Sequence, residues 1–159
     1  MDESGESGKI GATLDIVVFA CGALVMIYEI IGSRILAPFI GTSTYVWTSL
    51  IGVILGALSL GYWLGGKTAD RKPDVKYLAT AILIASGLVS FTTIAKETVL
   101  SIIASVPMWL EFKALVAALV LFAPASVALG FVTPFAVRLR IASLGEAGKT
   151  VGRLYALST

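Results

Sequence analysis

Three residues with chemically useful side chains lie together in an otherwise apolar stretch of the sequence. Tyr28, Glu29 and Arg34 belong to the heptapeptide YEIIGSR, which follows the run IVVFACGALVMI, and the next charged residue is Lys67. A charge held in hydrocarbon costs on the order of 3 kcal/mol even on permissive insertion scales, so such a residue usually has a partner or a function. Glu29 is therefore a candidate site for a cation or a proton, with Tyr28 and Arg34 as candidate neighbours.

A competing interpretation is that Glu29 and Arg34 neutralise each other near the outer surface of a membrane and fix the depth of their helix. Residues five apart in an α-helix point about 140° away from one another, so the usual i, i+4 ion pair is not available to them. If the helix enters the membrane near Leu14, Arg34 lies about 30 Å along it and can extend its charge into the headgroups. Glu29 lies only about 22 Å along and should face the interior of a helical bundle.

Membrane-spanning helices are the elements that must position these residues. Hydrophobic residues make up 57% of the 159-residue chain, charged residues make up 14%, and the mean hydropathy is +0.94. Soluble domains have roughly 25% charged residues. Four apolar segments are long enough for spans, which take about 20 helical residues each; they are 14–36, 44–66, 77–95 and 114–137.

A fifth apolar segment, 98–110, has only 13 residues, which suits a short interfacial or re-entrant helix. The expected fold is thus all-α: a polytopic transmembrane helical bundle of about four spans with one short interfacial helix.

The distribution of basic residues predicts the orientation of this bundle. With four spans, nine basic residues fall on one side of the membrane and two on the other. The nine are Lys9, Lys67, Arg71, Lys72, Lys76, Arg138, Arg140, Lys149 and Arg153, and the two are Lys96 and Lys113. The positive-inside rule then predicts a multi-pass protein of the cell (plasma or inner) membrane with both termini in the cytoplasm.

Three regions are expected along the chain: a flexible cytoplasmic tail over 1–13, a transmembrane helical domain over 14–137 and a cytoplasmic basic segment over 138–159. The tail is rich in Gly, Ser and acidic residues, and it cannot bury enough apolar surface to offset the entropy of ordering. The final residues, TVGRLYALST, look like the start of a further helix. They are either a cytoplasmic amphipathic tail or the point where a further span begins and the sequence stops, and we favour the second, a truncated chain or one part of a split gene.

Composition argues against several kinds of chemistry. The chain contains one cysteine, Cys21, and no histidine, so zinc and haem sites lack their usual ligands and no metal or cofactor is expected. The basic residues form no Arg-rich or aromatic-interleaved patch, so no nucleic-acid partner is expected. The expected surroundings are the lipid bilayer.

The second apolar segment contains two pairs of glycines, Gly52-x-x-x-Gly56 and Gly61-x-x-x-Gly65. This spacing lets helix backbones approach closely in lipid. At about 100° per residue the two pairs fall on roughly opposite faces, which predicts packing on both sides of the helix. Tight packing inside one bundle and a helix that slides or rocks during transport are both open interpretations.

The loop GGKTADRKPDVK follows this segment, and its basic residues suit anchors at the membrane surface. Its G-x-x-A-D-R motif resembles the loop signature G-x-L-A-D-R-x-G-R-K of major facilitator transporters, with Thr68 in place of Leu and Pro73 in place of the second Gly. In that family the Asp accepts hydrogen bonds from a helix N-terminus across the bundle and steadies one conformation. The resemblance makes Gly66, Asp70 and Arg71 a candidate conformational latch.

Two prolines, Pro124 and Pro134, interrupt the fourth apolar segment. Each removes a backbone hydrogen bond and is expected to kink the helix. The freed carbonyl groups could line a cavity, or Ser126 and its neighbours could satisfy them.

Several of these motifs act together as a signature: the E-x-x-x-S-R tract from Glu29, the G-T-S-x-Y-V-W turn from Gly41, the G-x-x-A-D-R loop from Gly66, then GFVTPFAVRLR and the closing G-R-L-Y-A-L-S-T. Over most of residues 20–159 the sequence resembles the membrane domain of the spermidine synthase-like membrane proteins. In those proteins a multi-helix module of major-facilitator character precedes a soluble aminopropyltransferase domain.

The resemblance implies a chain that is not itself catalytic, because the Gly-rich and acidic motif that holds decarboxylated S-adenosylmethionine in such enzymes is absent from the sequence. Two functions are open. The first is a non-catalytic membrane module that anchors an aminopropyltransferase domain or subunit and feeds or exports its polyamine. The second is a small major-facilitator-like half-transporter that pairs with itself as a homo-oligomer and binds a cationic solute at Glu29. The first predicts a synthase domain downstream or in a neighbouring gene, and the second predicts a cation flux that Glu29→Gln abolishes.

Overall fold

Five helices make up the part of the chain that the computed structural model describes, residues 3–139, and no strand occurs in that part. In chain order they are α1 (Glu3–Ile40), α2 (Thr44–Arg71), α3 (Val75–Ser105), α4 (Leu110–Leu121) and a last helix, Ala123–Leu139. The all-α prediction is confirmed for these residues. The greater part of the predicted basic segment, residues 140–159, lies outside them.

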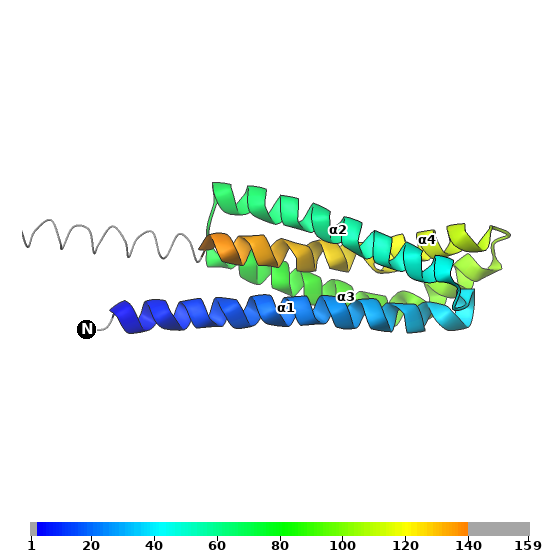
Figure 1. Cartoon of the computed structure of the whole chain (residues 1–159), viewed down its shortest axis with the longest axis horizontal. Coiled ribbons are helices and arrows are strands. Elements are labelled where there is room, and N and C mark those ends of the chain that lie inside the picture. Colours follow the sequence, from blue (N-terminus) through cyan, green and yellow to red (C-terminus); the bar gives the residue numbers. More distant parts are fainter. Residues whose placement is uncertain (1–2, 140–159) are drawn as a thin grey trace, which may run out of the picture.

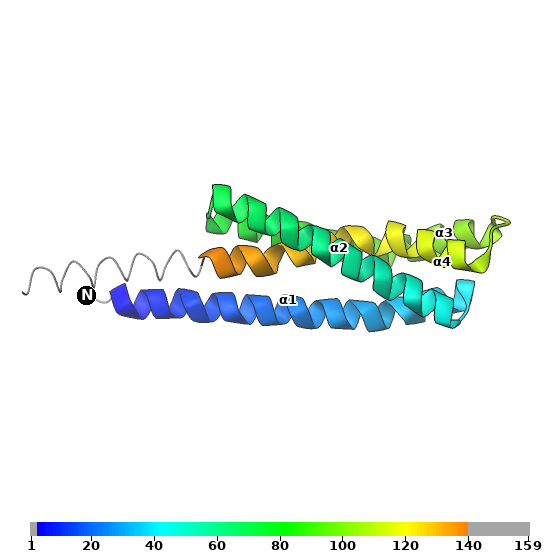
Figure 2. The same cartoon turned by 45° about the horizontal axis from the view of Figure 1, so that its top comes forward.

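The helices run up and down along one long axis, as Figure 1 shows. The start of α1, the α2–α3 connection and the end of Ala123–Leu139 lie at one end of the bundle, and the α1–α2 and α3–α4 connections lie at the other (Figures 1 and 2). α4 contacts α1, α2 and α3 through one face, and its opposite face is exposed.

Three of the helices are long and apolar enough to cross a membrane: α2, α3 and the part of α1 from Ala12 to Ile40. α4 and Ala123–Leu139 pass the same test only as a pair, bent by 51° at the break between them. Counting this pair as one broken span gives four spans, and the pair covers the predicted fourth segment, 114–137. The helices are therefore compatible with a multi-pass membrane protein.

The break in the fourth span lies at Phe122, two residues before Pro124. Proline has no N–H and its ring collides with the preceding helical turn, so the helix bends there as predicted. The helix Ala123–Leu139 continues through Pro134, so the backbone is not broken there. The fourth span thus has one break, at Phe122, and a kink at Pro134 stays a prediction.

The prediction of a separate interfacial helix over 98–110 is wrong. Residues up to Ser105 continue α3, and Val106 is the first residue with extended backbone angles. The helix ends there because Pro107 follows, and a residue that precedes proline avoids the helical conformation. The charged pair Lys96 and Glu97, which suggested the end of a span, lies inside one continuous helix.

Other helix ends also differ from the predicted limits. α1 begins at Glu3 and not near Leu14, and α2 continues to Arg71, beyond the predicted end at residue 66. Hydropathy reports where a helix can be buried in lipid, whereas the backbone hydrogen bonds can continue into polar sequence. The apolar runs therefore located the helices and underestimated their length.

Short polar caps start α2 and α3. The Val46 N–H donates to Ser43 Oγ over 3.4 Å at the start of α2, and the Lys76 N–H donates to Asp74 Oδ1 over 2.9 Å at the start of α3. Each cap satisfies one of the N–H groups that the first helical turn leaves without a partner. Gly41, with φ of 93°, supplies the left-handed turn between α1 and α2 that lets the chain reverse direction.

The second glycine pair of α2 packs within the chain. A Cβ added at Gly61 would overlap the Val127 carbonyl oxygen, and one added at Gly65 would overlap the Phe131 carbonyl oxygen. On the opposite helix, a Cβ at Gly130 would lie 2.8 Å from a backbone oxygen of α2. The backbones of α2 and Ala123–Leu139 therefore touch, which only glycine allows at these positions.

The first glycine pair, Gly52 and Gly56, meets nothing within 4 Å of an added Cβ. Both residues are exposed on the face of α2 that is turned away from the described helices. Packing on both sides of α2, as predicted, is thus present on one side only within residues 3–139.

Candidate functional site

Glu29 lies in a cavity of about 220 Å³ between α1, α2 and the helix Ala123–Leu139. Two other polar side chains line it, Tyr62 from α2 and Thr133 from the last helix. The remaining lining consists of Cys21, glycines and apolar side chains; Gly22 and Gly130 leave the space that larger residues would fill.

Helical spacing explains how these residues converge. α1 presents Gly22, Met26 and Glu29 on one face, because residues four and seven positions apart lie above one another along a helix. Leu58 and Tyr62 of α2 are four apart and face the same space. The close contact between α2 and the last helix keeps the other two walls of the cavity together.

The Glu29 carboxylate is half-buried, and no residue within the described range forms a hydrogen bond or ion pair with it. It belongs to the candidate span Ala12–Ile40, about 26 Å from its first residue and about 17 Å from its last. The carboxylate is therefore placed well inside the apolar part of the helix, as the sequence predicted. The hydroxyl groups of Tyr62 and Thr133 also have no partner among residues 3–139.

This arrangement has the chemistry of a cation site. A carboxylate accepts hydrogen bonds on both oxygens, and each hydroxyl adds acceptor lone pairs that can complete the shell of an ammonium group. Bonds between an ionised donor and an ionised acceptor are roughly twice as strong as neutral ones, and apolar walls strengthen them by excluding water.

Arg34 takes no part in this site. Its side chain is exposed, and no ion pair links it to Glu29 within the described residues. The mutual neutralisation of Glu29 and Arg34 is therefore not found, in agreement with the 140° or so between their directions on the helix.

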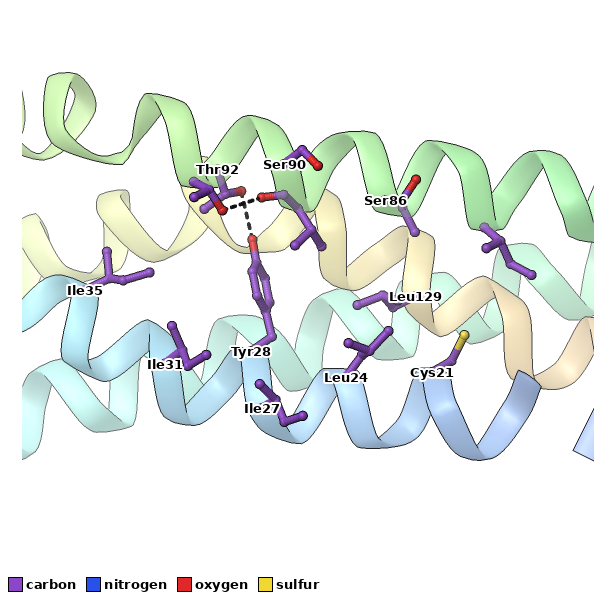
Figure 3. Close-up of a pocket in the computed structure, with 14 residues that line it drawn as sticks. Cys21, Leu24, Ile27, Tyr28, Ile31, Ile35, Ser86, Ser90, Thr92 and Leu129 are labelled. Atoms are coloured by element: carbon purple, nitrogen blue, oxygen red, sulfur yellow. Dashed lines mark hydrogen bonds between the residues drawn. The ribbon is translucent and has the colours of Figure 1, made fainter. Parts of the chain in front are cut away.

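Tyr28 also points away from the Glu29 cavity, although it is the adjacent residue. Its hydroxyl lies 2.8 Å from Thr92 Oγ1 on α3 (Figure 3). It also lies 3.1 Å from the Leu121 carbonyl oxygen. Tyr28 is buried, and its ring packs on Phe122 with 5.0 Å between the centroids. The structure thus places this predicted site residue in a hydrogen-bonded core and not beside the free carboxylate.

A larger cavity of about 410 Å³ lies on that other side of α1, against α3 (Figure 3). Its lining is mostly aliphatic, with the hydroxyls of Tyr28, Ser86, Ser90, Thr92 and Thr93 and the buried Cys21 thiol. No charged side chain lines it. It therefore has no carboxylate that could neutralise a bound cation.

The candidate latch residues lie at the end of the bundle where α2 and α3 are connected. Asp70 Oδ1 is 3.1 Å from Arg138 Nε, so an ion pair joins α2 to the end of the last helix. Both side chains are exposed, by 68% and 49%, and such pairs contribute at most about 1 kcal/mol. Gly66 faces open space and Arg71 is exposed with no ion pair to a described residue. The conformational role of these residues stays a prediction.

Two residues of the Glu29 cavity escaped the sequence analysis, Tyr62 and Thr133. Aromatic residues and threonines are common in membrane helices, so neither gives a signal by its type. Thr92 was missed for the same reason. What identifies them is the contact between helices that are distant in sequence.

Comparison with protein-family models, curated proteins and solved structures finds no match. The class that the fold defines is an all-helical protein with three to four helices able to span a membrane. Within that class the distinctive site is a single carboxylate in a small cavity of the bundle. The similarity to spermidine synthase-like membrane proteins stays a prediction from sequence motifs.

Proposed function

We propose that the chain is a non-catalytic membrane module that binds an organic ammonium cation of the polyamine class at Glu29 and anchors or supplies an aminopropyltransferase partner. The observation that carries the proposal is the Glu29 carboxylate, which lies without a partner among the described residues in a cavity of about 220 Å³. A charge in such a position costs free energy that a bound cation would return.

An ammonium group fits this cavity better than a metal ion. Calcium and magnesium take six or more oxygen ligands, and no group of three or more His, Cys, Asp or Glu side chains forms a metal site within residues 12–139. The Tyr62 ring adds a surface that attracts cations, and the apolar walls suit the methylene groups of an aliphatic amine. The polyamine assignment also rests on the predicted resemblance of the sequence motifs to those of spermidine synthase-like proteins.

A second candidate is a half-transporter for the same class of solute, and the broken fourth span favours it. Leu129, Gly130 and Thr133, which form one wall of the cavity, all follow the 51° bend. Interrupted helices beside a binding site are frequent in secondary transporters, where they change shape as the site opens.

Binding is tested with the purified full chain in liposomes and radiolabelled spermidine or putrescine. Glu29→Gln keeps the size of the side chain and removes its charge, so amine affinity should fall at least about ten-fold, the value of one charge-assisted hydrogen bond. Glu97→Gln is the matched control, since Glu97 is exposed on α3 and does not line the cavity. Unchanged affinity in Glu29→Gln, or no amine binding by the wild type, would contradict the proposal.

Two further readouts separate the alternatives. Uptake of the labelled amine into the liposomes supports the half-transporter, whereas binding without uptake supports the anchoring module. The thermal unfolding midpoint of Glu29→Gln should equal or exceed that of the wild type without amine, because a costly unpaired charge has been removed. A lower midpoint would indicate that Glu29 has a structural partner.

A further inference from the structure

The carbonyl group of Leu121 has an unusual set of partners at the bend of the fourth span. In an unbroken helix it would accept the N–H of the residue four positions later. At the bend it accepts side-chain hydroxyls instead: Thr92 Oγ1 lies 2.8 Å away and the Tyr28 hydroxyl lies 3.1 Å away. These hydroxyls come from α3 and α1, so three helices meet at one backbone oxygen.

Each hydroxyl has one proton and two acceptors within reach, so several arrangements are possible, and two of them use different donors to Leu121. In one, Tyr28 donates to Thr92 over 2.8 Å and Thr92 donates to Leu121. In the other, Tyr28 donates to Leu121 and Thr92 donates to the Leu88 carbonyl over 3.0 Å. Both leave the Leu121 oxygen paired, and all three groups are buried.

The side chains around this contact are closely fitted. The Phe122 ring, at the break itself, packs on Tyr28 with an angle of 57° between the ring planes. On α1, a Cβ added at Gly32 would lie 2.8 Å from Phe122 Cε1, so α1 approaches the break as closely as glycine permits. Phe122 is fully buried. The position of the break relative to α1 is therefore set by both packing and hydrogen bonds.

The bend has a direct consequence for the Glu29 cavity, since the wall formed by Gly130 and Thr133 belongs to the helix after the break. Thr133 lies ten residues beyond Ala123, about 15 Å along the helix, so a change of about 10° in the bend would move it by about 2–3 Å. That displacement is comparable with the length of a hydrogen bond to a bound ammonium group.

We propose that Tyr28 and Thr92 are positioning residues that fix the bend at Leu121 and, through it, the wall of the cavity opposite Glu29. The effect on amine binding rests on the proposed function; the effect on the bend does not. Tyr28 and Glu29 are neighbours on α1 with different roles. Tyr28 fixes the bend of the fourth span, and Glu29 supplies the carboxylate that faces the helix after the bend.

The bend is measured as a distance between spin labels on cysteines introduced at Phe19 of α1 and Val137 of the last helix, which are both exposed and line the same small cavity, so that a sideways movement of the last helix relative to α1 is detected. Cys21 is only 6% exposed, so the introduced cysteines react first, and a sample without them measures residual labelling. Tyr28→Phe with Thr92→Val removes both hydroxyls and keeps the shapes. Val137 lies about 21 Å along the helix from Ala123, so about 10° of bending displaces it by about 3–4 Å, and the distance distribution should shift or broaden on that scale.

Thr93→Val is the matched control, because Thr93 is exposed and its hydroxyl donates only within its own helix, to the Val89 carbonyl over 3.1 Å. It should leave the distance and the amine affinity unchanged. In the double variant amine affinity should fall about five-fold or more, the value of one lost neutral hydrogen bond, with Glu29 still present.

The outcomes distinguish this inference from the proposed function. A double variant whose distance distribution matches the wild type overturns the inference, whatever its amine affinity. A changed distance with unchanged affinity also overturns it, because the bend then does not control the cavity. If the wild type binds no amine, the proposed function fails, and the distance measurement alone decides whether Tyr28 and Thr92 fix the bend.

Discussion

The two glycine pairs of α2 allow a matched test of the helix packing. Gly61 lies against the backbone of the last helix, where an added Cβ would overlap the Val127 carbonyl oxygen and lie 3.0 Å from Gly130 Cα. Gly56, on the same helix, has nothing within 4 Å of an added Cβ. Gly61→Ala and Gly56→Ala therefore make the same chemical change in one helix, with and without a neighbouring backbone.

The expected difference between these variants follows from the contacts. Replacing glycine by alanine inside a helix favours the helix by up to about 1 kcal/mol, and this gain is common to both positions. Overpacking costs typically about 1–3 kcal/mol, and it applies only at Gly61. The obstacle there is backbone, which cannot move aside as a flexible side chain can. The free energy of unfolding of Gly61→Ala should therefore be about 1–3 kcal/mol lower than that of Gly56→Ala.

The measurement is the free energy of unfolding in detergent micelles, with Gly52→Ala as a second control because Gly52 also faces open space. Gly65→Ala should resemble Gly61→Ala, since its Cβ would overlap the Phe131 carbonyl oxygen. Equal stability of Gly61→Ala and Gly56→Ala would refute the reasoning, because it would mean that α2 and the last helix do not touch through their backbones. Destabilisation by Gly56→Ala alone would place the close contact on the opposite face of α2.

Two predictions concern the ends of the bundle. Asp70→Asn should lower the free energy of unfolding by at most about 1 kcal/mol, and by less at high salt, because its ion pair with Arg138 is exposed. Exchanging the two charges between these positions should restore the stability. A loss of stability that does not depend on salt would contradict this account. Lys113→Met should lower the free energy of unfolding by about 1–2 kcal/mol, because Lys113 Nζ donates to the Ala104 carbonyl over 2.7 Å near the end of α3. Thermal or denaturant unfolding measures this loss, and an unchanged stability would show that the carbonyl needs no partner.

The sequence predicted the helices well where a single physical property determines where a helix forms or breaks. Long apolar runs located α1, α2 and α3, because crossing a hydrocarbon core requires length and low polarity together. The break near Pro124 was predictable from proline alone. The segment 98–110 was misjudged because a helix can continue through the charges before it, Lys96 and Glu97, but not through Pro107 inside it.

The glycine pairs show a different limit. Both have the spacing that permits close approach, and sequence alone gives them equal weight. Only Gly61 and Gly65 meet a neighbouring helix within residues 3–139, because the fold places Ala123–Leu139 on that side of α2. Which side a helix turns toward its neighbour depends on the packing of all of them, and no single segment contains that information.

The residues of the candidate site also differ in how far the sequence predicts them. Glu29 was predictable because a charge in an apolar run is rare and costly. Tyr62 and Thr133 were not, because their residue types are ordinary in membrane helices and only the meeting of three helices makes them neighbours. Tyr28 was selected for its position beside Glu29, yet consecutive helical residues point about 100° apart, and this rotation separates the two side chains into different parts of the bundle.

The neighbouring positions of Tyr28 and Glu29 make that separation informative. Rotation along α1 turns Tyr28 toward α3 and the bend, where its hydroxyl is paired, and turns Glu29 toward α2 and the last helix, where its carboxylate is not paired with any described residue. A site that holds a charge needs walls that do not collapse onto the charged group. The paired hydroxyls of Tyr28 and Thr92 fix the bend near this site, and they cost little free energy because each buried hydroxyl has a hydrogen-bond partner. A stable core contact directly beside an unpaired charge is therefore the arrangement expected of a binding site, whereas a merely structural glutamate would be expected to pair with a cation from another helix of the bundle.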